Sequence, residues 1–256
     1  MNMVFYFTAT GNSLYAAKQL DTDLYSIPQV MRQDDLEFTA ESIGVAAPVY
    51  GHEVPAMVKE FLHKAVFHTD YFYLILTYGN RHGGAAELAK QLCDECGIQV
   101  NYINVLLMVD NWLPTFDMNE QKRIDKKVDE HLAAIKKDLA ERKNWIFPVT
   151  DKDRAAHQEF CGRMKQMPPD AWQHLICVKP SCIGCGICEK VCPSGSIRVE
   201  NGRAVHHPGN CQTCFACVHA CPQKAIGLAI PEKNPDARYR NEHIQLEEII
   251  RANCQK

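Results

Sequence analysis

The first half of the chain alternates between short apolar runs and helical patterns. The apolar runs are rich in β-branched and aromatic residues and predict buried strands; they are residues 3–7, 42–48, 71–78 and 101–109. Helical spacing follows each run, at residues 14–20, in a stretch through Leu62, at 85–96 and at 119–143. Strands that alternate with helices predict an α/β domain with a doubly wound parallel sheet. We expect five strands, the last at residues 101–109, in a first domain that covers residues 1–145.

The helical and strand periodicity weakens after residue 143, where prolines interrupt it. We assign residues 146–174 to a connector, with room for a short helix over 151–165. A second, smaller domain is expected at residues 175–230, because this segment contains two equivalent halves that each end near a strand-like piece. Residues 231–256 then form a polar loop and a capped final helix over 241–251.

Eight of the thirteen cysteines lie in two copies of one motif, C-x2-C-x2-C-x3-C-P. Three cysteines of such a run hold one [4Fe–4S] cluster, and the fourth is a ligand of the other cluster in two-cluster proteins. The two predicted ligand sets are Cys182, Cys185, Cys188 and Cys221, and Cys211, Cys214, Cys217 and Cys192. Zinc sites do not show this repeated, proline-terminated run, and a disulfide framework needs an oxidising compartment. The motif therefore predicts a small α+β domain with two [4Fe–4S] clusters.

A hydroxyl-rich loop with one glycine follows the first predicted strand and precedes the first helix. A helix N-terminus offers unpaired N–H groups and the positive end of a dipole to a phosphate. The loop has neither the lysine of a Walker A loop nor a G-x-G-x-x-G fingerprint. It resembles the T-x-T-G-N-T/S loop of flavodoxins, which binds the phosphate of FMN; a plain helix cap is the alternative. The loop residues that this resemblance assigns to FMN are Thr8, Thr10, Gly11, Asn12 and Ser13.

Two further loops leave the carboxyl ends of predicted strands. In a doubly wound sheet, loops on either side of the switch point form the ligand crevice. Flavodoxins hold the isoalloxazine ring between the corresponding loops, usually with an aromatic residue, and the loop glycines here would let the backbone lie against the ring. The candidate ring-binding residues are Pro48, Val49, Tyr50, Gly51, Tyr78, Gly79, Asn80, Gly83 and Gly84.

Three polar residues in these loops are candidates for chemistry at the ring: His52, Arg81 and His82. A histidine can protonate or hydrogen-bond the reduced flavin because it titrates near neutral pH, and Arg81 would neutralise the anionic reduced ring. Exposed loop side chains without such a role are the alternative interpretation. Trp112, in the loop after the fifth strand, either covers the flavin or faces the second domain.

Charge and composition argue against two classes of protein, nucleic-acid binders and membrane-spanning proteins. The net charge of -3 is not that of a nucleic-acid binder, and no apolar run approaches the length of a membrane span. Residues 1–150 carry fourteen basic and twenty acidic side chains, whereas residues 175–230 carry five basic and two acidic ones. Opposite charges favour contact between the two domains. The chain begins without a basic n-region or cleavage site, so we expect a cytoplasmic protein, and oxygen-sensitive clusters indicate an anaerobic setting.

The order of the two parts resembles the flavodoxin–ferredoxin fusion proteins of the EFR1 family. The resemblance implies a flavodoxin-like FMN domain, a ferredoxin domain with two [4Fe–4S] clusters, and electron transfer. We expect an internal relay, since clusters exchange single electrons and FMN can hold one or two. An FMN-dependent reductase of a small substrate and an iron–sulfur redox sensor or docking module are the alternatives. The redox partner, whether a protein or a small-molecule acceptor, is not identified by the sequence, and the oligomeric state stays open, a homodimer included.

Overall fold

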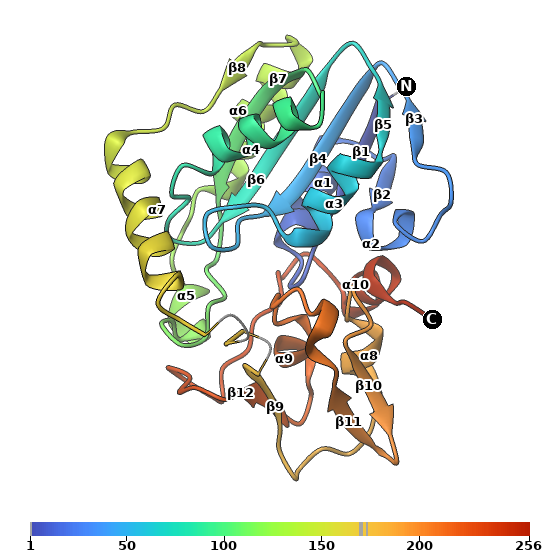
Figure 1. Ribbon diagram of the computed structural model, residues 1–256, viewed down its shortest axis with the longest axis vertical. Coiled ribbons are helices and arrows are strands. Elements are labelled where there is room, and N and C mark those ends of the chain that lie inside the picture. The colour runs from blue at the N-terminus through green and yellow to red at the C-terminus, as the bar shows by residue number, and fades with distance from the viewer. Residues whose placement is uncertain (1, 169–170, 173) are drawn as a thin grey trace.

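The computed structural model describes residues 2–168, 171–172 and 174–256. Figure 1 shows two lobes along the long axis, an α/β lobe from the first part of the chain and a smaller cysteine-rich lobe below it. The predicted connector includes Pro169, Asp170 and Gln173, which lie outside the described residues. No described helix combines the length and the apolar character that crossing a membrane requires.

The upper lobe is built on a six-stranded parallel sheet with the order β2-β1-β4-β6-β7-β8. Its strands are β1 (Asn2–Tyr6), β2 (Leu24–Ser26), β4 (Ser42–Pro48), β6 (Phe72–Tyr78), β7 (Val100–Leu107) and β8 (Trp145–Ile146). The chain runs from β1 outward to β2 and then crosses to the other side of β1, which is the flavodoxin-like strand order. The predicted doubly wound fold is confirmed, and its switch point lies between β1 and β4.

The sheet has one strand more than the five that the sequence predicts. β8 pairs with β7 through two residue pairs, Tyr102 with Trp145 and Ile103 with Ile146. A strand of two residues is too short to give an apolar run, so periodicity alone does not reveal it. Because β8 spans the expected boundary at residue 145, the start of the connector is part of the sheet.

Helices cover both faces of the sheet, as Figure 1 shows, and bury a separate apolar core on each. On one face, Phe61 of α3 (Ala56–Lys64) and Ala89 of α4 (Ala85–Glu95) are buried. On the other face, Ala16 of α1 (Asn12–Leu20) and Ile135 of α6 (Val128–Ala140) are buried. Each of these helices has its apolar residues at helical spacing in the sequence. This amphipathic pattern therefore predicts correctly that each helix packs on the sheet.

Several elements differ in extent from the prediction. The expected helix over residues 119–143 is two helices, α5 (Met118–Gln121) and α6, separated by a loop that ends at Lys127 with φ of 53°. The helix expected over residues 151–165 is present as α7 (Asp151–Met164), and its N-terminus is closed by a capping box between Thr150 and Asp153. The short elements that periodicity did not locate are β2, α2 (Ile27–Val30), β3 (Glu37–Thr39) and β5 (Val66–His68).

The lower lobe contains two small antiparallel sheets, β9 with β12 and β10 with β11. Its elements are β9 (Ile176–Val178), α8 (Ile187–Lys190), β10 (Ile197–Glu200), β11 (Arg203–His206), η1 (Pro208–Asn210), α9 (Ala216–Ala220) and β12 (Ile226–Leu228). Each cysteine run surrounds a short helix and is followed by a strand, so the duplication seen in the sequence is also a duplication of structure.

The last helix, α10 (Leu246–Asn253), joins the two lobes. The fully buried Asn253 donates one hydrogen bond to the carbonyl of Thr8 in the upper lobe and another to the carbonyl of Val191 in the lower lobe. Ile249 is buried in the same core as Ala16 of α1. The chain therefore returns after the lower lobe and closes the joint between the lobes.

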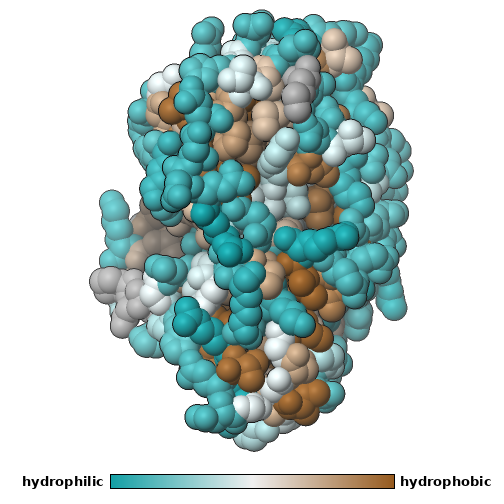
Figure 2. Space-filling view, turned by 90° about the vertical axis from the view of Figure 1, so that its right-hand side faces the viewer, coloured by the Kyte–Doolittle hydropathy of each residue, from teal (hydrophilic) through white to brown (hydrophobic). Residues whose placement is uncertain are grey.

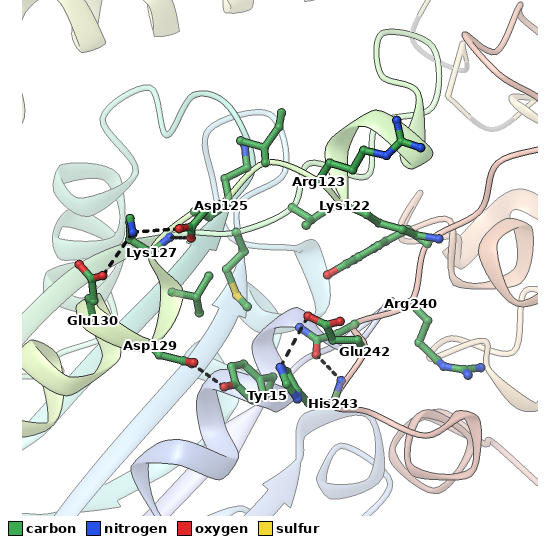
Figure 3. Close-up of a pocket in the computed structure, with 17 residues that line it drawn as sticks. Tyr15, Lys122, Arg123, Asp125, Lys127, Asp129, Glu130, Arg240, Glu242 and His243 are labelled. Atoms are coloured by element: carbon green, nitrogen blue, oxygen red, sulfur yellow. Dashed lines mark hydrogen bonds and ion pairs between the residues drawn. The ribbon is translucent and has the colours of Figure 1, made fainter.

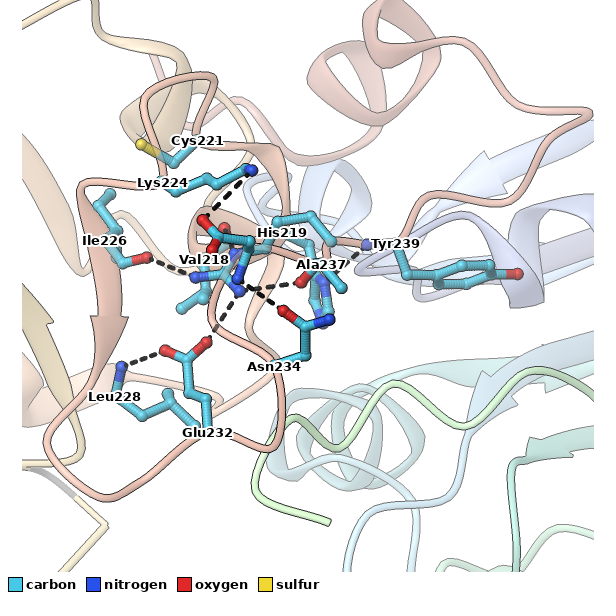
Figure 4. A network of polar contacts seen from close by, with 12 residues as sticks. Val218, His219, Cys221, Lys224, Ile226, Leu228, Glu232, Asn234, Ala237 and Tyr239 are labelled. Carbon is cyan, nitrogen blue, oxygen red and sulfur yellow. Dashed lines mark hydrogen bonds and ion pairs between the residues drawn. The ribbon is translucent and has the colours of Figure 1, made fainter. Parts of the chain in front are cut away.

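A buried polar network holds the segment before α10 in place (Figure 4). Arg238 and Glu232 form an ion pair of 2.8 Å with side chains only 9% and 6% exposed, and Glu232 also accepts from the Leu228 N–H. His219 accepts the Tyr239 N–H through Nδ1, which leaves Nε2 as the donor to the Asn111 carbonyl. α9 of the cysteine-rich lobe is thus tied directly to the loop after β7.

Candidate cofactor sites

The hydroxyl-rich loop lies between β1 and α1, as the sequence predicts, and its side chains hold one another in place. The Gly11 N–H donates to Thr8 Oγ1 at 3.1 Å, and Gly11 has φ of 101° in the left-handed region. Ser13 Oγ lies 2.8 Å from Thr77 Oγ1, and Thr10 Oγ1 accepts from the Asn111 side chain at 2.8 Å. The loop is therefore pre-formed at the N-terminus of α1, where backbone N–H groups favour an anion.

Asn12 connects this loop to both neighbouring parts of the chain. Its Nδ2 donates to the Val109 carbonyl at 3.1 Å. Its Oδ1 accepts from the Tyr239 hydroxyl at 2.6 Å and from Asn241 Nδ2 at 3.3 Å. The start of α1 is thus fixed by the loop after β7 and by the segment that follows the cysteine-rich lobe.

A cavity of about 760 Å³ opens at the carboxyl ends of the central strands, a size typical of small-molecule sites. The predicted residues that line it are Thr8, Thr10, Asn12, Ser13, Pro48, Val49, Tyr50, Gly51, His52, Tyr78, Gly79, Asn80 and Arg81. The structure therefore brings the three predicted loops together around one space.

Four predicted residues do not line this cavity: Gly11, Gly83, Gly84 and His82. Gly83 packs against the His52 ring, where an added Cβ would come within 2.1 Å of Cγ. His82 turns toward α7, with Nε2 3.6 Å from Asp153 Oδ1. Gly84 packs against Val149, so both glycines allow close packing with neighbouring segments. Gly79 does line the cavity, and its missing Cβ leaves room for the Asp110 backbone.

His52 lies in the cavity wall with a left-handed backbone, φ 74°. Its Nδ1 is buried and has no hydrogen-bond partner among the described residues. Burial lowers the pKa of His52, and the neighbouring His157 and Arg81 lower it further. The imidazole is therefore held neutral, and its Nδ1 packs against Gly83.

The cavity has a further wall that sequence patterns did not reveal. α7 contributes Phe160, Arg163 and Met164, and Trp172 lies beside them. No residue of α7 is fully buried, so the helix lacks the apolar stripe that would have marked it as part of a site. The segment that we expected to be only a connector forms one side of the cavity.

The cysteines gather around two small cavities of the lower lobe. One is lined by Cys182, Cys185, Cys188 and Cys221, and the other by Cys192, Cys211, Cys214 and Cys217. This is the crosswise arrangement in which the fourth cysteine of each run joins the other set. Backbone N–H groups point at the sulfurs, including those of Ala204 to Cys182, Ala225 to Cys221 and Ser196 to Cys192.

Burial controls the charge of these thiols. It raises the pKa of Cys188 to about 11 and that of Cys217 well above the ordinary thiol value. Cys182 differs, because hydrogen bonds from the backbone N–H groups of Ala204 and Gly184 lower its pKa. Burial thus favours the neutral thiols, and a positively charged group between them, such as the iron of a cluster, would favour the thiolates.

The second cysteine cavity and the cavity of the upper lobe share a wall. Residues 211–215, which include Cys211 and Cys214, line the larger cavity, whereas the first cysteine set does not. Cys214 packs against the same apolar core as Tyr50. The pKa of Tyr50 is raised mainly by its own burial and secondly by the negative charge of Cys214. Gln212 Oε1 accepts from the Met57 N–H at 2.9 Å, which docks this loop on α3.

Trp112 faces the second domain, one of the two alternatives that the sequence left open, and it also lines the upper cavity. It lines the cavity of the upper lobe, and its ring stacks on Phe215 of the lower lobe with centroids 5.3 Å apart and planes at 23°. An aromatic side chain therefore bridges the upper cavity and the cysteine loop.

A second large cavity, of about 620 Å³, lies between the α5–α6 loop and the segment before α10 (Figure 3). None of the predicted site residues lines it. In its wall Lys127 pairs with Asp125 and Glu130, and Tyr15 donates to Asp129, whereas the salt bridges of the described residues include none with the other basic side chains of the wall, Lys122, Arg123, Lys126 and Arg240. Nothing in these contacts indicates a flavin or a cluster.

Comparison with known proteins decides the nature of the cysteine-rich lobe. Residues 181–225 match the family described as 4Fe-4S dicluster domain. An uncharacterized ferredoxin of Methanocaldococcus jannaschii is 34% identical over 68 residues, which are 24% of this chain and 88% of that protein. The chain belongs to the ferredoxin family. Residues 181–225 therefore form its 4Fe-4S dicluster domain.

Other similarities cover only parts of larger or different proteins. One subunit of an ion-translocating oxidoreductase complex of Methanosarcina acetivorans is 55% identical over 47 residues, 18% of each chain. The chain thus spans about a fifth of the length of that relative. Among solved structures, the Trp repressor binding protein of Bacillus subtilis aligns over 57% of this chain and 100% of its own, with 11% identity and a TM-score of 0.36.

Proposed function

We propose that this protein relays electrons between two [4Fe–4S] clusters of the ferredoxin domain and an FMN bound in the upper lobe. The observation that carries the proposal is the shared wall: Cys211 and Cys214 belong to the second cysteine set and also line the 760 Å³ cavity. Clusters exchange single electrons and FMN holds one or two, so such a pair connects one-electron and two-electron chemistry.

The described residues fit both kinds of cofactor. The N–H groups at the start of α1 and the hydroxyls of Thr8, Thr10 and Ser13 would hold the FMN phosphate. Tyr50 and Tyr78 would hold the isoalloxazine ring, with His52 in the same cavity wall. The two sets of four cysteines would each hold one cluster.

Cofactor analysis tests this proposal directly. Protein purified without oxygen is expected to contain eight irons, eight sulfides and one FMN per chain, because each cysteine set has the four thiolates of a cube and the predicted flavin loops meet around one cavity. Iron, acid-labile sulfide and flavin assays give the three numbers. Four irons, or no flavin after purification with FMN present, would contradict the proposal.

Asn12→Ala is expected to weaken FMN binding by about ten-fold or more, because leaving a partly buried hydrogen-bond partner unsatisfied costs about 1–3 kcal/mol. The substitution removes the contacts of Asn12 with Val109 and Tyr239 that fix the start of α1. FMN affinity is measured by fluorescence titration of flavin-depleted protein. Asn119→Ala, at an exposed residue outside the cavity, is the control; equal FMN affinities would show that Asn12 does not shape the flavin site.

A reductase of a small substrate is the second candidate function. It is favoured by the side chains of Arg81 and Arg163, which line the cavity and would attract an anionic substrate, with the neutral His52 beside them. In a reductase, the reduced protein would be reoxidised rapidly by one anionic small molecule. In a relay, only protein partners would reoxidise it rapidly, so reoxidation rates with both kinds of acceptor separate the two functions.

A further inference from the structure

The two cysteine cavities differ in their access to solvent. Cys185 of the first set is exposed, and Ile183 beside it is 62% exposed, the highest value among the exposed large hydrophobic residues of the described chain. Cys217 and Cys192 of the second set are buried. Figure 2 shows hydrophobic side chains gathered toward the lower end of the molecule, where the ferredoxin domain lies. The first set therefore presents an apolar surface to solvent, whereas the second adjoins the flavin cavity.

Basic residues surround the exposed loop of the first set. Lys179 and Arg203 are exposed, and neither has an ion pair among the described residues; Arg203 donates to the Val178 carbonyl at 2.8 Å, and its charge contributes to the lowered pKa of Cys182. Lys224 lies three residues after Cys221 and reaches only the exposed Asp236, at 3.6 Å. This part of the surface thus carries positive charge that the chain itself leaves largely unmatched.

The acidic side chains of the ferredoxin domain do not neutralise this surface. Glu189 pairs with Lys256 at 2.9 Å, and Glu200 pairs with His207 at 2.7 Å. The sequence predicted that the basic ferredoxin domain would contact the acidic first domain through its charges. In the described part of the chain, no ion pair joins its five basic residues to an acidic residue of the first 150. Their charge is therefore available to a separate molecule.

We propose that the surface formed by Ile183, Cys185, Lys179, Arg203 and Lys224 docks an acidic one-electron carrier protein. This surface is called the entry face, and its role rests on the proposed relay. One electron passes between the carrier and the first cluster, so the carrier is oxidised by one electron as the cluster is reduced, and no bond forms or breaks. The exposed apolar centre with a basic rim matches an acidic protein partner, because complementary charges orient the encounter.

Binding of a small acidic two-cluster ferredoxin, used as the probe, tests this inference with the cluster-loaded protein. By isothermal titration calorimetry, the double variant Lys179→Glu with Arg203→Glu is expected to bind about ten-fold more weakly or worse. Added salt should weaken binding of the unaltered protein, since exposed charges are screened. The control is Lys136→Glu, an exposed lysine on α6 of the upper lobe, which should bind like the unaltered protein.

Three results would overturn the entry face: no binding at low salt, equal binding by the double variant, or equal weakening by the control. The proposed relay is tested separately by the iron and flavin contents and by reduction with dithionite, which needs no protein docking. A double variant that keeps eight irons and one FMN, and that dithionite still reduces, has lost only the partner. The two proposals can therefore fail independently.

An independent observation concerns the second cysteine cavity. His206 lies at the end of β11, opposite Ile197 of β10, and lines the cavity together with Cys192, Cys211, Cys214 and Cys217. Its Nε2 is buried and has no hydrogen-bond partner among the described residues. A buried nitrogen without a partner is unfavourable, and the sulfurs of a cluster in this cavity are the acceptors within its reach.

We infer that His206 donates a hydrogen bond from Nε2 to a sulfur of the second cluster and raises the reduction potential of that cluster. Hydrogen bonds to cluster sulfurs stabilise the more negative, reduced state. The potential of the cluster nearest the flavin would then be set by a residue outside the cysteine motif. His206 acts as a positioning and tuning residue, since it is not a ligand.

Redox titration followed by electron paramagnetic resonance tests this role. His206→Leu is expected to lower the potential of the second cluster and to leave that of the first unchanged, whereas His206→Gln, which keeps an N–H donor, should restore part of the shift. Both variants should retain eight irons. An unchanged potential in the leucine variant, an equal shift of both clusters, or loss of the second cluster in both variants would overturn the inference.

Discussion

Cys214→Ala is expected to lower the iron content from eight to four per chain and to abolish reduction of the flavin through the clusters. Cys214 is one of the four cysteines around the second cavity, and it also lines the proposed flavin cavity and packs with Tyr50. A [4Fe–4S] cluster is held by four cysteine thiolates, so a cluster that lacks one of them is expected to be lost from the protein. Iron analysis and rapid-mixing spectroscopy of flavin absorbance, with a reduced carrier protein as donor, measure the two effects.

Cys185→Ala is the matched control, because it removes a ligand of the first set, which does not line the flavin cavity. It should also lower the iron content to four, but the flavin should still be reduced by a small donor that can reach the second cluster. Equal flavin reduction in both variants would contradict a route through the second cluster. Loss of flavin reduction in neither variant would mean that electrons reach the flavin without the clusters.

Arg238→Met is expected to destabilise the folded protein by about 3–5 kcal/mol, the usual effect of removing one partner of a buried ion pair. Glu232 is only 6% exposed on its side chain and would keep a buried, uncompensated charge. Arg238 also donates to the Val218 carbonyl on α9, so the substitution loosens the segment before α10. Chemical denaturation of cluster-loaded protein without oxygen measures the change in the free energy of unfolding.

Lys64→Met is the control for this prediction. Lys64 forms an ion pair with Glu60 on α3 in which both side chains are more than half exposed, 57% and 52%. An exposed pair of this kind contributes about 0–1 kcal/mol. If both substitutions changed stability by the same small amount, the network of Figure 4 would not be what holds the last segment of the chain in place.

The sequence predicted those parts of the fold that carry a strong local pattern. β4 has the predicted bounds, Ser42–Pro48, because a buried central strand is apolar along its whole length. The two-residue β8 and the short pair of β3 and β5 were not predicted, since they are too short to produce a periodic pattern. The break between α5 and α6 was also not predicted, because the apolar spacing continues through a loop that only the backbone at Lys127 reveals.

In the candidate sites, too, the features with a local sequence pattern were predicted and the features that depend on distant contacts were not. The crosswise grouping of the cysteines is written in the motif spacing, and the loops at the carboxyl ends of strands follow from the topology of a parallel sheet. The contribution of α7 to the cavity, and of Cys214 to its wall, depends on how distant segments pack together. Local patterns do not encode such contacts, and for that reason Phe160 and His206 could not be predicted as site residues.

The most direct measurement is a crystal structure of protein prepared without oxygen, with iron located by anomalous scattering. We predict eight iron atoms in two groups of four, one group inside each cysteine cavity, and a flavin in the 760 Å³ cavity beside residues 211–215. A flavin bound elsewhere, or a cavity that stays empty when FMN is supplied in excess, would contradict the proposed relay.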